Sequence, residues 1–219
     1  NVGTLDGGTG SDWLRFHHAN SNFEGINGWD ELTLDEAGAS NFENIQGTEN
    51  AEVIKGDANA NILTGSTGGN DTLHGYAGDD YLFGQSGESL SSISGMVGHA
   101  SSSGYSGNDT LYGGDDDDYL YGGYGTDTLD GGTGTDNLFG GAGNDVFIMR
   151  ANDGSTSLAS ADIIQDYTDN ADSFGMAGGL QFSNLSISQG TGENSSDTLI
   201  KITASNEYLA IVLNTNATD

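Results

Sequence analysis

Five aspartates recur every nine residues through the middle of the chain, at Asp109, Asp118, Asp127, Asp136 and Asp145. A glycine stands five residues before each of them, from Gly104 to Gly140, and the register does not slip. Glycine permits the positive φ values that turn backbone carbonyls inward. Carboxylates and carbonyls are the oxygen ligands that calcium takes in groups of about six to eight. The pattern therefore predicts a series of calcium sites built from turns.

The same period predicts the elements that hold these turns in place. An apolar residue follows two positions after each aspartate, at Leu111, Leu120, Leu129, Leu138 and Phe147. Each nine-residue unit then supplies a six-residue turn and a three-residue strand, and successive units lie on opposite sheets. Like edges recur at every second unit, and an ion is expected between two turns on one edge. The predicted fold class is all-β: a right-handed parallel β-roll, a calcium-binding solenoid, with a C-terminal β cap.

The repeats of residues 104–148 resemble those of RTX (repeats-in-toxin) haemolysin-type calcium-binding proteins; they read GYSGNDTLY, GGDDDDYLY, GGYGTDTLD, GGTGTDNLF and GGAGNDVFI. Farther on, ADIIQDY and DSF resemble the segment that commonly closes RTX rolls. GMAGGLQFSNLSISQ and DTLIKIT with EYLAIV look like the tails of cyanobacterial RTX proteins. The resemblance implies a module exported by type I secretion, hence secreted and located outside a bacterium or on its surface.

The resemblance also implies a ligand set. In the family, the first turn of a pair gives the carbonyls of its second and fourth residues and its aspartate, and the later turn gives the carbonyls of its first and third residues and its aspartate. Carried onto this sequence, the three sites are Tyr105, Gly107 and Asp109 with Gly122, Tyr124 and Asp127; Gly114, Asp116 and Asp118 with Gly131, Thr133 and Asp136; and Gly123, Gly125 and Asp127 with Gly140, Ala142 and Asp145. Asp127 would bridge two ions, so binding should be cooperative along the row.

Imperfect copies of the turn precede this block. Asp71 with Gly69 and Asp80 with Gly78 are candidate metal residues, and so are Asp12 and Asp30, which a spacing of two units would place face to face across one coil. In the unit that opens at Gly84, Ser89 takes the aspartate place, so that site should be missing or weak. In the units at 47–64, Glu52 and Asn61 stand in that place, which predicts β-roll geometry without strong calcium sites.

Three regions follow from these patterns. Residues 1–64 are expected to form degenerate β-roll coils, and residues 65–148 the calcium-binding roll, interrupted by a Ser- and Gly-rich insertion at 88–103 that projects from one side. Residues 149–219 are expected to form the C-terminal capping region, because an open solenoid end would expose apolar core and unpaired strand edges.

The composition makes a cation part of the predicted fold. The 219 residues include 33 acidic and only 4 basic side chains, a formal net charge of -29, which argues against nucleic acid as a partner. Leu, Ile, Val and Phe make up just under one fifth of the chain, a composition that by itself favours disorder. Ligation would convert the mutual repulsion of the carboxylates into attraction, so that binding and folding become one event. We therefore expect a largely unfolded chain at neutral pH without calcium.

Other function classes find less support in the sequence. There are no cysteines, and no apolar run of about 18 residues predicts a membrane span. The sequence starts at Asn1 without a charged and apolar leader, which suggests a processed form or an excised piece. We find no G-x-S-x-G or H-E-x-x-H motif, so a non-catalytic module is expected.

Two alternatives remain open for this module. The first is a self-assembling, calcium-dependent extracellular fibre or surface-layer protein. The second is an accessory glycan-binding module of a secreted enzyme, with a surface glycan bound on the sheet face that would carry Tyr119, Tyr121, Asn137 and Phe139. Aromatic pairs across neighbouring strands that stabilise the sheet are the simpler interpretation of this face. The opposite sheet would display Thr110, Tyr112, Thr128 and Asp130.

Overall fold

A computed structural model describes residues 44–47, 51, 53–65, 69–78, 80–84 and 107–217, together with the strand segments at 5–6, 13–15, 31–33 and 39–40. Nearly all of the regular structure in these residues is β-strand, with three single-turn 3-10 helices, η2 (Leu158–Ser160), η3 (Phe182–Asn184) and η4 (Gly192–Asn194). The predicted all-β class is confirmed. None of the helices in the described part has the length and apolarity needed to cross a membrane.

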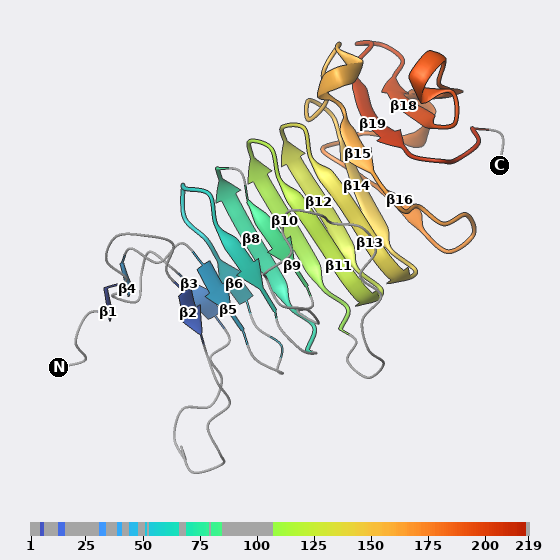
Figure 1. Ribbon diagram of the computed structural model, residues 1–219. Coiled ribbons are helices and arrows are strands. Elements are labelled where there is room, and N and C mark those ends of the chain that lie inside the picture. The colour runs from blue at the N-terminus through green and yellow to red at the C-terminus, as the bar shows by residue number, and fades with distance from the viewer. Residues whose placement is uncertain are drawn as a thin grey trace.

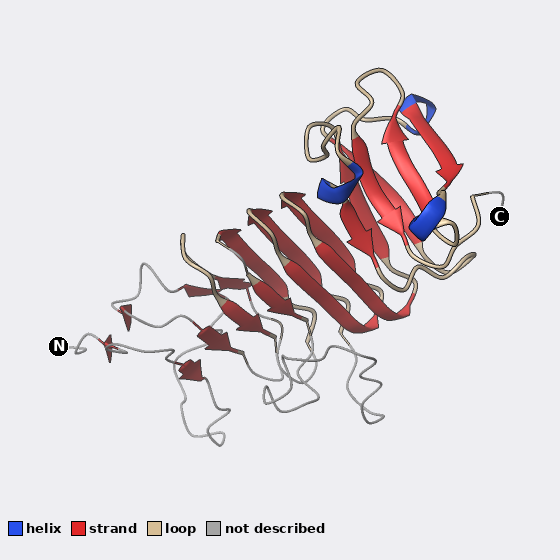
Figure 2. Ribbon diagram, turned by 45° about the horizontal axis from the view of Figure 1, so that its top comes forward, coloured by secondary structure: helices blue, strands red, loops and turns tan. Residues whose placement is uncertain are grey.

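Two long sheets face each other along the length of the molecule (Figure 1; Figure 2). The first has seven strands, in the order β16 (Ser173–Ala177), β14 (Val146–Arg150), β12 (Thr128–Thr133), β10 (Thr110–Asp115), β8 (Thr72–Ala77), β6 (Val53–Lys55) and β3 (Glu31–Thr33). The second has ten strands, in the order β17 (Leu185–Gln189), β18 (Thr198–Ile202), β19 (Tyr208–Val212), β15 (Asp162–Ile164), β13 (Asn137–Gly143), β11 (Tyr119–Gly125), β9 (Tyr81–Phe83), β7 (Ile62–Thr64), β5 (Asn44–Gln46) and β2 (Trp13–Arg15). A separate pair joins β1 (Leu5–Asp6) to β4 (Ala39–Ser40).

Strand pairing in the repeats is parallel and follows the predicted period. Thr110 pairs with Thr128 and Tyr119 with Asn137, in each case two repeat units farther along the chain, while β10 and β11 lie in different sheets. Consecutive nine-residue units therefore alternate between the two sheets. A parallel β-roll is the fold that this alternation produces.

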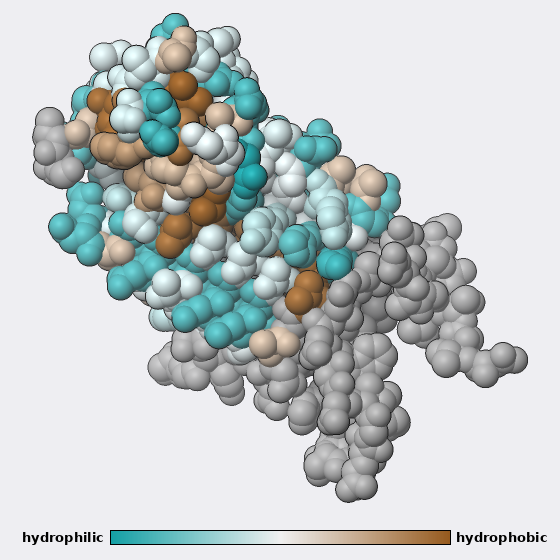
Figure 3. Space-filling view, turned by 180° about the vertical axis from the view of Figure 1, so that it is seen from behind, coloured by the Kyte–Doolittle hydropathy of each residue, from teal (hydrophilic) through white to brown (hydrophobic). Residues whose placement is uncertain are grey.

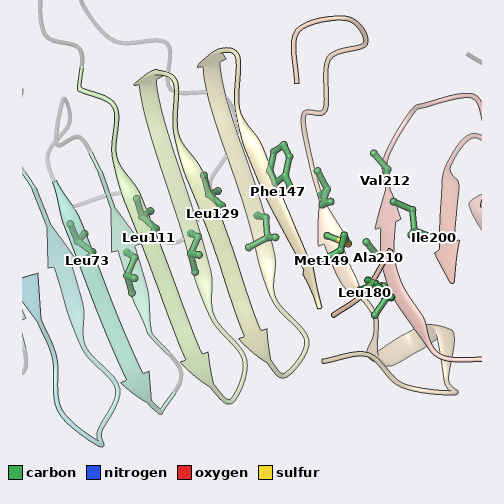
Figure 4. Packing of buried hydrophobic residues seen from close by; sticks show 14 of the residues in the cluster. Leu73, Leu111, Leu129, Phe147, Met149, Leu180, Ile200, Ala210 and Val212 are labelled. Carbon is green, nitrogen blue, oxygen red and sulfur yellow. The ribbon is translucent and has the colours of Figure 1, made fainter. Parts of the chain in front are cut away.

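One apolar side chain per unit fills the space between the sheets. These side chains stack along the roll and are at most 1% exposed; they are Ile45, Ile54, Leu63, Leu73, Leu82, Leu111, Leu120, Leu129, Leu138 and Phe147. Figure 4 shows Leu73, Leu111, Leu129 and Phe147 aligned on successive strands. Since each coil contributes only two such residues, the core is thin. Apolar burial is correspondingly small for a chain of this length.

The sheets continue into residues 149–217, where the repeat has ended. Here β14 and β16 pair in parallel and β15 pairs with β19, but β17, β18 and β19 pair antiparallel. Met149, Leu180, Ile200, Ala210 and Val212 extend the apolar cluster into this region (Figure 4). In the space-filling view, apolar residues gather at this C-terminal end, whereas the roll surface is mainly polar (Figure 3).

The first coils differ from expectation. The regular two-unit spacing expected from residue 12 to residue 30 is not seen in the strands that follow them, because β2 pairs with β5 in the ten-stranded sheet, whereas β3 pairs with β6 in the seven-stranded sheet. The chain between β2 and β3 thus passes from one sheet to the other, whereas two regular units would return it to the same sheet. Asp12 and Asp30 themselves lie outside the described residues.

Candidate metal centre

The aspartates of the repeat form a hydrogen-bonded ladder along each edge of the roll. The six residues of a turn are numbered so that Gly113 is position 1 and Asp118 is position 6. The Oδ1 atom of Asp127 accepts the N–H of Asp109, one coil earlier, at 2.8 Å, and Asp145 does the same for Asp127 at 2.9 Å. On the other edge, Asp118 Oδ1 accepts the N–H of Asp80, and Asp136 Oδ1 accepts the N–H of Asp118. The ladder therefore orients each carboxylate and engages its Oδ1 atom in a hydrogen bond.

The second oxygen of these carboxylates accepts no hydrogen bond in the described part of the chain. The Oδ2 atoms are buried and accept no hydrogen bond in Asp71, Asp80, Asp109, Asp118, Asp127, Asp136 and Asp145. Burial raises the pKa of Asp127 and of Asp136 to about 7, although hydrogen bonds from the backbone oppose the shift. Burial likewise raises the pKa of Asp109 and Asp145 to about 6. Such orphaned anionic oxygens are costly unless a cation compensates them.

A small space faces each of these oxygens, and the glycine at position 1 keeps it open. A Cβ on Gly113 would lie 2.3 Å from Asp118 Oδ2 and 2.4 Å from the carbonyl oxygen of Gly131 in the next coil. A Cβ on Gly122 would lie 2.5 Å from Asp127 Oδ2 and 2.7 Å from the Gly140 oxygen. A side chain would therefore fill the place where a carboxylate and a carbonyl of two coils converge. Glycine is required here because of this space.

The same arrangement occurs at three earlier turns. Gly65 faces Asp71 Oδ2 and the Gly84 carbonyl, Gly75 faces Asp80 Oδ2 and the Gly113 carbonyl, and Gly84 faces Asp109 Oδ2 and the Gly122 carbonyl. The described residues thus contain five cradles made of one orphaned carboxylate oxygen and one carbonyl oxygen from the next coil. At Gly131 and Gly140 the three nearest atoms all belong to the turn's own aspartate. The series of such pairs therefore ends where the repeat ends.

Carbonyls at positions 2 and 4 point forward into the next coil. A Cβ on Gly132 would lie 2.0 Å from the Gly114 oxygen, and one on Gly125 would lie 1.7 Å from the Gly107 oxygen. Both glycines have positive φ, 102° for Gly132 and 147° for Gly125. The ligand set that the resemblance implies also takes the second and fourth carbonyls from an earlier turn, and this ligand set stays a prediction.

The donors suit calcium better than a softer metal. They are carboxylate and carbonyl oxygens, and calcium prefers hard oxygen ligands, whereas zinc takes nitrogen and sulfur. In the part of the chain that the structure describes, no group of three or more His, Cys, Asp or Glu side chains could hold an ion. A site made mainly of backbone carbonyls and only one or two carboxylates is consistent with that observation. The residues present therefore fit calcium.

Most of the residues expected at the sites are found on these turns. Position 4 of a turn is occupied by Gly69, Gly78, Gly107, Asp116 and Gly125, and position 2 is occupied by Gly114 and Gly123. Tyr124, Thr133 and Ala142 occupy position 3, inside β11, β12 and β13. Gly122, Gly131 and Gly140 open their turns. Tyr105 lies outside the described residues.

The turn that opens at Gly84 corrects one expectation. The carboxylate in the cradle of Gly84 is that of Asp109, and Ser89, the expected sixth residue, lies outside the described residues. Gly84 also donates its N–H to the Tyr121 carbonyl, as Gly65 does to the Phe83 carbonyl. Gly84 therefore takes the place that the sequence assigned to Gly104.

The turn that ends at Asn61 has the same shape but different chemistry. A Cβ on Gly56 would meet Asn61 Oδ1 at 2.1 Å and the Gly75 oxygen at 2.9 Å. Asn61 Oδ1, however, accepts the N–H of Asp57 at 2.8 Å, so a hydrogen bond within the turn satisfies it. The roll geometry expected in this coil is therefore present, and the lack of a strong calcium site there stays a prediction.

Residues beyond the repeat complete the aspartate ladder. Asp162 Oδ1 accepts the N–H of Asp136 at 3.1 Å, and Asp172 Oδ1 accepts that of Asp145 at 2.9 Å. Asp166 accepts the N–H groups of Gly140 and Gly141 at 2.9 and 2.7 Å. Their spacing departs from nine residues, so the period did not identify them. The ADIIQDY and DSF segments were the available signal.

A further ladder, at position 5, was missed by the sequence reasoning. Asn70 Oδ1 accepts the N–H of Asn108 at 2.9 Å, and Asn108 Oδ1 accepts that of Thr126 at 2.8 Å. On the other edge Asp117 Oδ1 accepts the N–H of Thr135 at 2.7 Å. These side chains bond to the following coil, whereas the position 6 carboxylates bond to the preceding one. Asn, Asp and Thr at this position were the available signal.

The outer faces of the sheets carry the expected residues. Tyr81 stacks on Tyr119 with ring centroids 4.9 Å apart, and Tyr121 stacks on Phe139 at 5.0 Å. These contacts support the interpretation that aromatic pairs stabilise the sheet. Asp130 differs from its expected display, because it is only 5% exposed and pairs with the Arg150 guanidinium.

Comparison with known proteins places the repeats in a family. The model of the RTX calcium-binding nonapeptide repeat (4 copies) matches residues 56–89, 101–129 and 121–148. Among solved structures, the extracellular lipase LipA from Serratia marcescens is 16% identical with a TM-score of 0.36, covering 85% of this chain and 40% of the lipase. The AlgE6R3 subunit of the Azotobacter vinelandii mannuronan C5-epimerase is 21% identical with a TM-score of 0.25, covering 78% of this chain and 74% of that one.

A search of curated proteins found no match. The chain spans about two fifths of the length of the lipase. The turns that contain the cradles lie within the residues that the family model matches. Repeats of this family bind Ca2+, and the series of buried aspartates indicates several sites. Residues 56–89 and 101–148 therefore carry RTX calcium-binding nonapeptide repeats.

Proposed function

We propose that this chain is a non-catalytic calcium-binding module of an exported bacterial protein, and that it folds when it binds calcium outside the cell. The observation that carries the proposal is that the Oδ2 atoms of Asp109 and Asp127 are buried, accept no hydrogen bond and face a carbonyl of the next coil across a space that Gly84 and Gly122 keep open. Type I secretion and an extracellular or cell-surface location are parts of the same proposal. Support for them comes from the RTX repeat family.

The ligands in this proposal come from pairs of turns on one edge. Between the turns of Asp118 and Asp136, they are the carbonyls of Gly114 and Asp116 with Asp118, and the carbonyls of Gly131 and Thr133 with Asp136. Calcium supplies the positive charge that the buried carboxylates lack. The chain orients the ligands: the ladder hydrogen bonds hold Oδ1 of each aspartate, so Oδ2 faces the cradle.

Shared carboxylates couple neighbouring sites. Asp127 accepts a bond from Asp109 and donates its own N–H to Asp145, so a shift of one turn displaces the next. Ordering one site therefore prepares the ligands of the following site. Cooperative binding along each edge is the expected consequence.

Secretion before folding is compatible with the charge of the chain. At a net charge of -29, repulsion between carboxylates opposes compaction whenever calcium is scarce. Millimolar calcium outside the cell would supply the missing cations. The proposal is tested by titrating chelated protein with calcium while circular dichroism follows strand content; a transition accompanied by uptake of several ions supports it. Full strand content in excess chelator contradicts it.

A further inference from the structure

The turn that ends at Asp109 is assembled from two separate pieces of chain. Its opening glycine is Gly84, because a Cβ there would lie 2.4 Å from Asp109 Oδ2 and 2.6 Å from the Gly122 oxygen. The corresponding distances at Gly122, in an uninterrupted turn, are 2.5 and 2.7 Å. The two cradles therefore have the same form, although Gly84 and Asp109 are far apart in the sequence, whereas Gly122 and Asp127 belong to one contiguous turn.

The far side of this turn begins at Gly107. A Cβ on Gly107 would lie 1.9 Å from the Gly69 oxygen, and one on Gly125 would lie 1.7 Å from the Gly107 oxygen. Gly107 thus stands at position 4 in the stack of turns along this edge. Asn108 and Asp109 follow at positions 5 and 6, where both join the ladders.

The strand register gives the same division. Thr110 pairs with Thr72 on one side and with Thr128 on the other, so β8, which precedes the interruption, and β10, which follows it, occupy neighbouring places in one sheet. The coil that leads from Thr72 to Thr110 is nevertheless much longer in sequence than the regular coil from Thr110 to Thr128. In the sequence, the additional residues therefore fall between Gly84, at position 1, and Gly107, at position 4. On either side of them the backbone keeps the repeat geometry.

We propose that Gly84 and the segment 107–109 form one calcium turn across this interruption, with Gly122 and Asp127 on the next coil. The inference rests on the calcium binding proposed above and adds a site that is not a contiguous hexapeptide. Asp109 Oδ2 and the Gly107 carbonyl are its ligands from one side, and the Gly122 carbonyl is a ligand from the other. Bound calcium would lie beside Gly84 and would be ligated from residues 107–109, so the site would include chain from before and from after the interruption.

Three glycine-to-alanine variants distinguish this arrangement from a contiguous turn at 104–109. In Gly84→Ala and in Gly122→Ala, the new methyl group occupies a cradle, so each variant should bind fewer calcium ions than the wild type. Gly104→Ala should bind the wild-type number. Native mass spectrometry at saturating calcium counts the ions, and isothermal titration calorimetry measures affinity, which should fall about tenfold for the remaining coupled site.

A fourth variant covers the case in which Gly84→Ala does not fold. Replacing residues 85–106 with Gly-Thr creates the contiguous turn Gly-Gly-Thr-Gly-Asn-Asp, which differs from residues 131–136 only at position 5. This variant should fold in calcium and retain the wild-type number of ions, although Gly104 is gone.

The outcomes separate the two proposals. Loss of an ion in Gly104→Ala and in the replacement, with none lost in Gly84→Ala, would overturn the split turn in favour of a contiguous one. Loss in Gly122→Ala alone would show that the split turn is not a site. Unchanged ion numbers in all variants, Gly122→Ala included, would contradict the calcium function itself.

Discussion

Asp127 Oδ1 accepts the backbone N–H of Asp109 at 2.8 Å, across one full coil of the roll. The two oxygens of the Asp127 carboxylate therefore have different roles. One oxygen continues the ladder, and the other, Oδ2, is buried without a protein partner. Since the ladder alone leaves a buried anion uncompensated at neutral pH, we expect the fold to be complete at that pH only when a cation is bound.

Asp118→Asn should separate the ladder from ion binding. The amide oxygen can still accept the N–H of Asp80, now 2.8 Å from Asp118 Oδ1, but an NH2 group replaces the anionic ligand. We expect calcium affinity at this site to fall by about tenfold or more, because ligand charge sets affinity. Calorimetry measures the loss.

Asp117→Asn is the matched control for that variant. Asp117 is the neighbouring residue and is exposed, and its Oδ1 accepts the N–H of Thr135. Removing the same formal charge there should change affinity only slightly. Equal losses in the two variants would show that general charge, rather than ligation, governs binding.

Protonation should stabilise the metal-free roll. Burial raises the pKa of Asp127 and Asp136 from 3.8 to about 7, so the folded chain holds protons that the unfolded chain releases above about pH 4. This contribution is fully present below pH 4 and is lost as the pH rises through 7. With chelator, strand content should be higher at pH 4.5 than at pH 7.5. If the strand content measured by circular dichroism without calcium increased toward neutral pH, this prediction would be refuted.

The same carboxylates predict the opposite pH dependence for calcium. Protons and calcium compete for Asp127 and Asp136, so affinity should rise between about pH 5.5 and 7.5. Proton release on binding, measured by calorimetry in buffers of different ionisation enthalpy, should diminish above pH 7. A pH-independent affinity across this range would argue against buried carboxylate ligands.

Asn108→Ala should weaken the roll without removing an ion. The substitution removes the acceptor of the Thr126 N–H at position 5 and should cost about 0.5–1 kcal/mol. Thermal unfolding at saturating calcium measures the change. Asn144→Ala is the control, because Asn144 holds the same position in the last repeat turn and has no later repeat coil to bond. A changed ion number in Asn108→Ala would show that position 5 takes part in the sites.

Arg150 should matter for stability independently of calcium. Its guanidinium pairs with the buried Asp130, and its Nε lies 3.3 Å from Asp153 Oδ2. Arg150→Gln should destabilise the calcium-loaded protein by about 2 kcal/mol, less than for a fully buried pair because the arginine is partly exposed. Adding Asp130→Asn should recover much of the loss. A double variant no more stable than Arg150→Gln would contradict the pairing.

The period predicted the coils well because glycine and aspartate fix the phase of turn and strand together. Every Leu that it assigned to the core between Leu111 and Leu138 is buried. It failed at Gly84, because an interruption within a turn carries no signal for which later residue resumes position 6. Ser89 is the next candidate by count, but spatial contact selects Asp109. The antiparallel pairing of β17, β18 and β19 likewise depends on contacts that alternation alone does not specify.

One titration of the chelated chain with calcium at pH 7.5 tests calcium-dependent folding most directly. Circular dichroism should follow strand content while native mass spectrometry counts bound ions. We predict little strand structure in excess chelator and a cooperative transition to the roll that coincides with uptake of several ions per chain. Unchanged strand content between chelator and millimolar calcium, or folding without bound ions, would contradict the central claim.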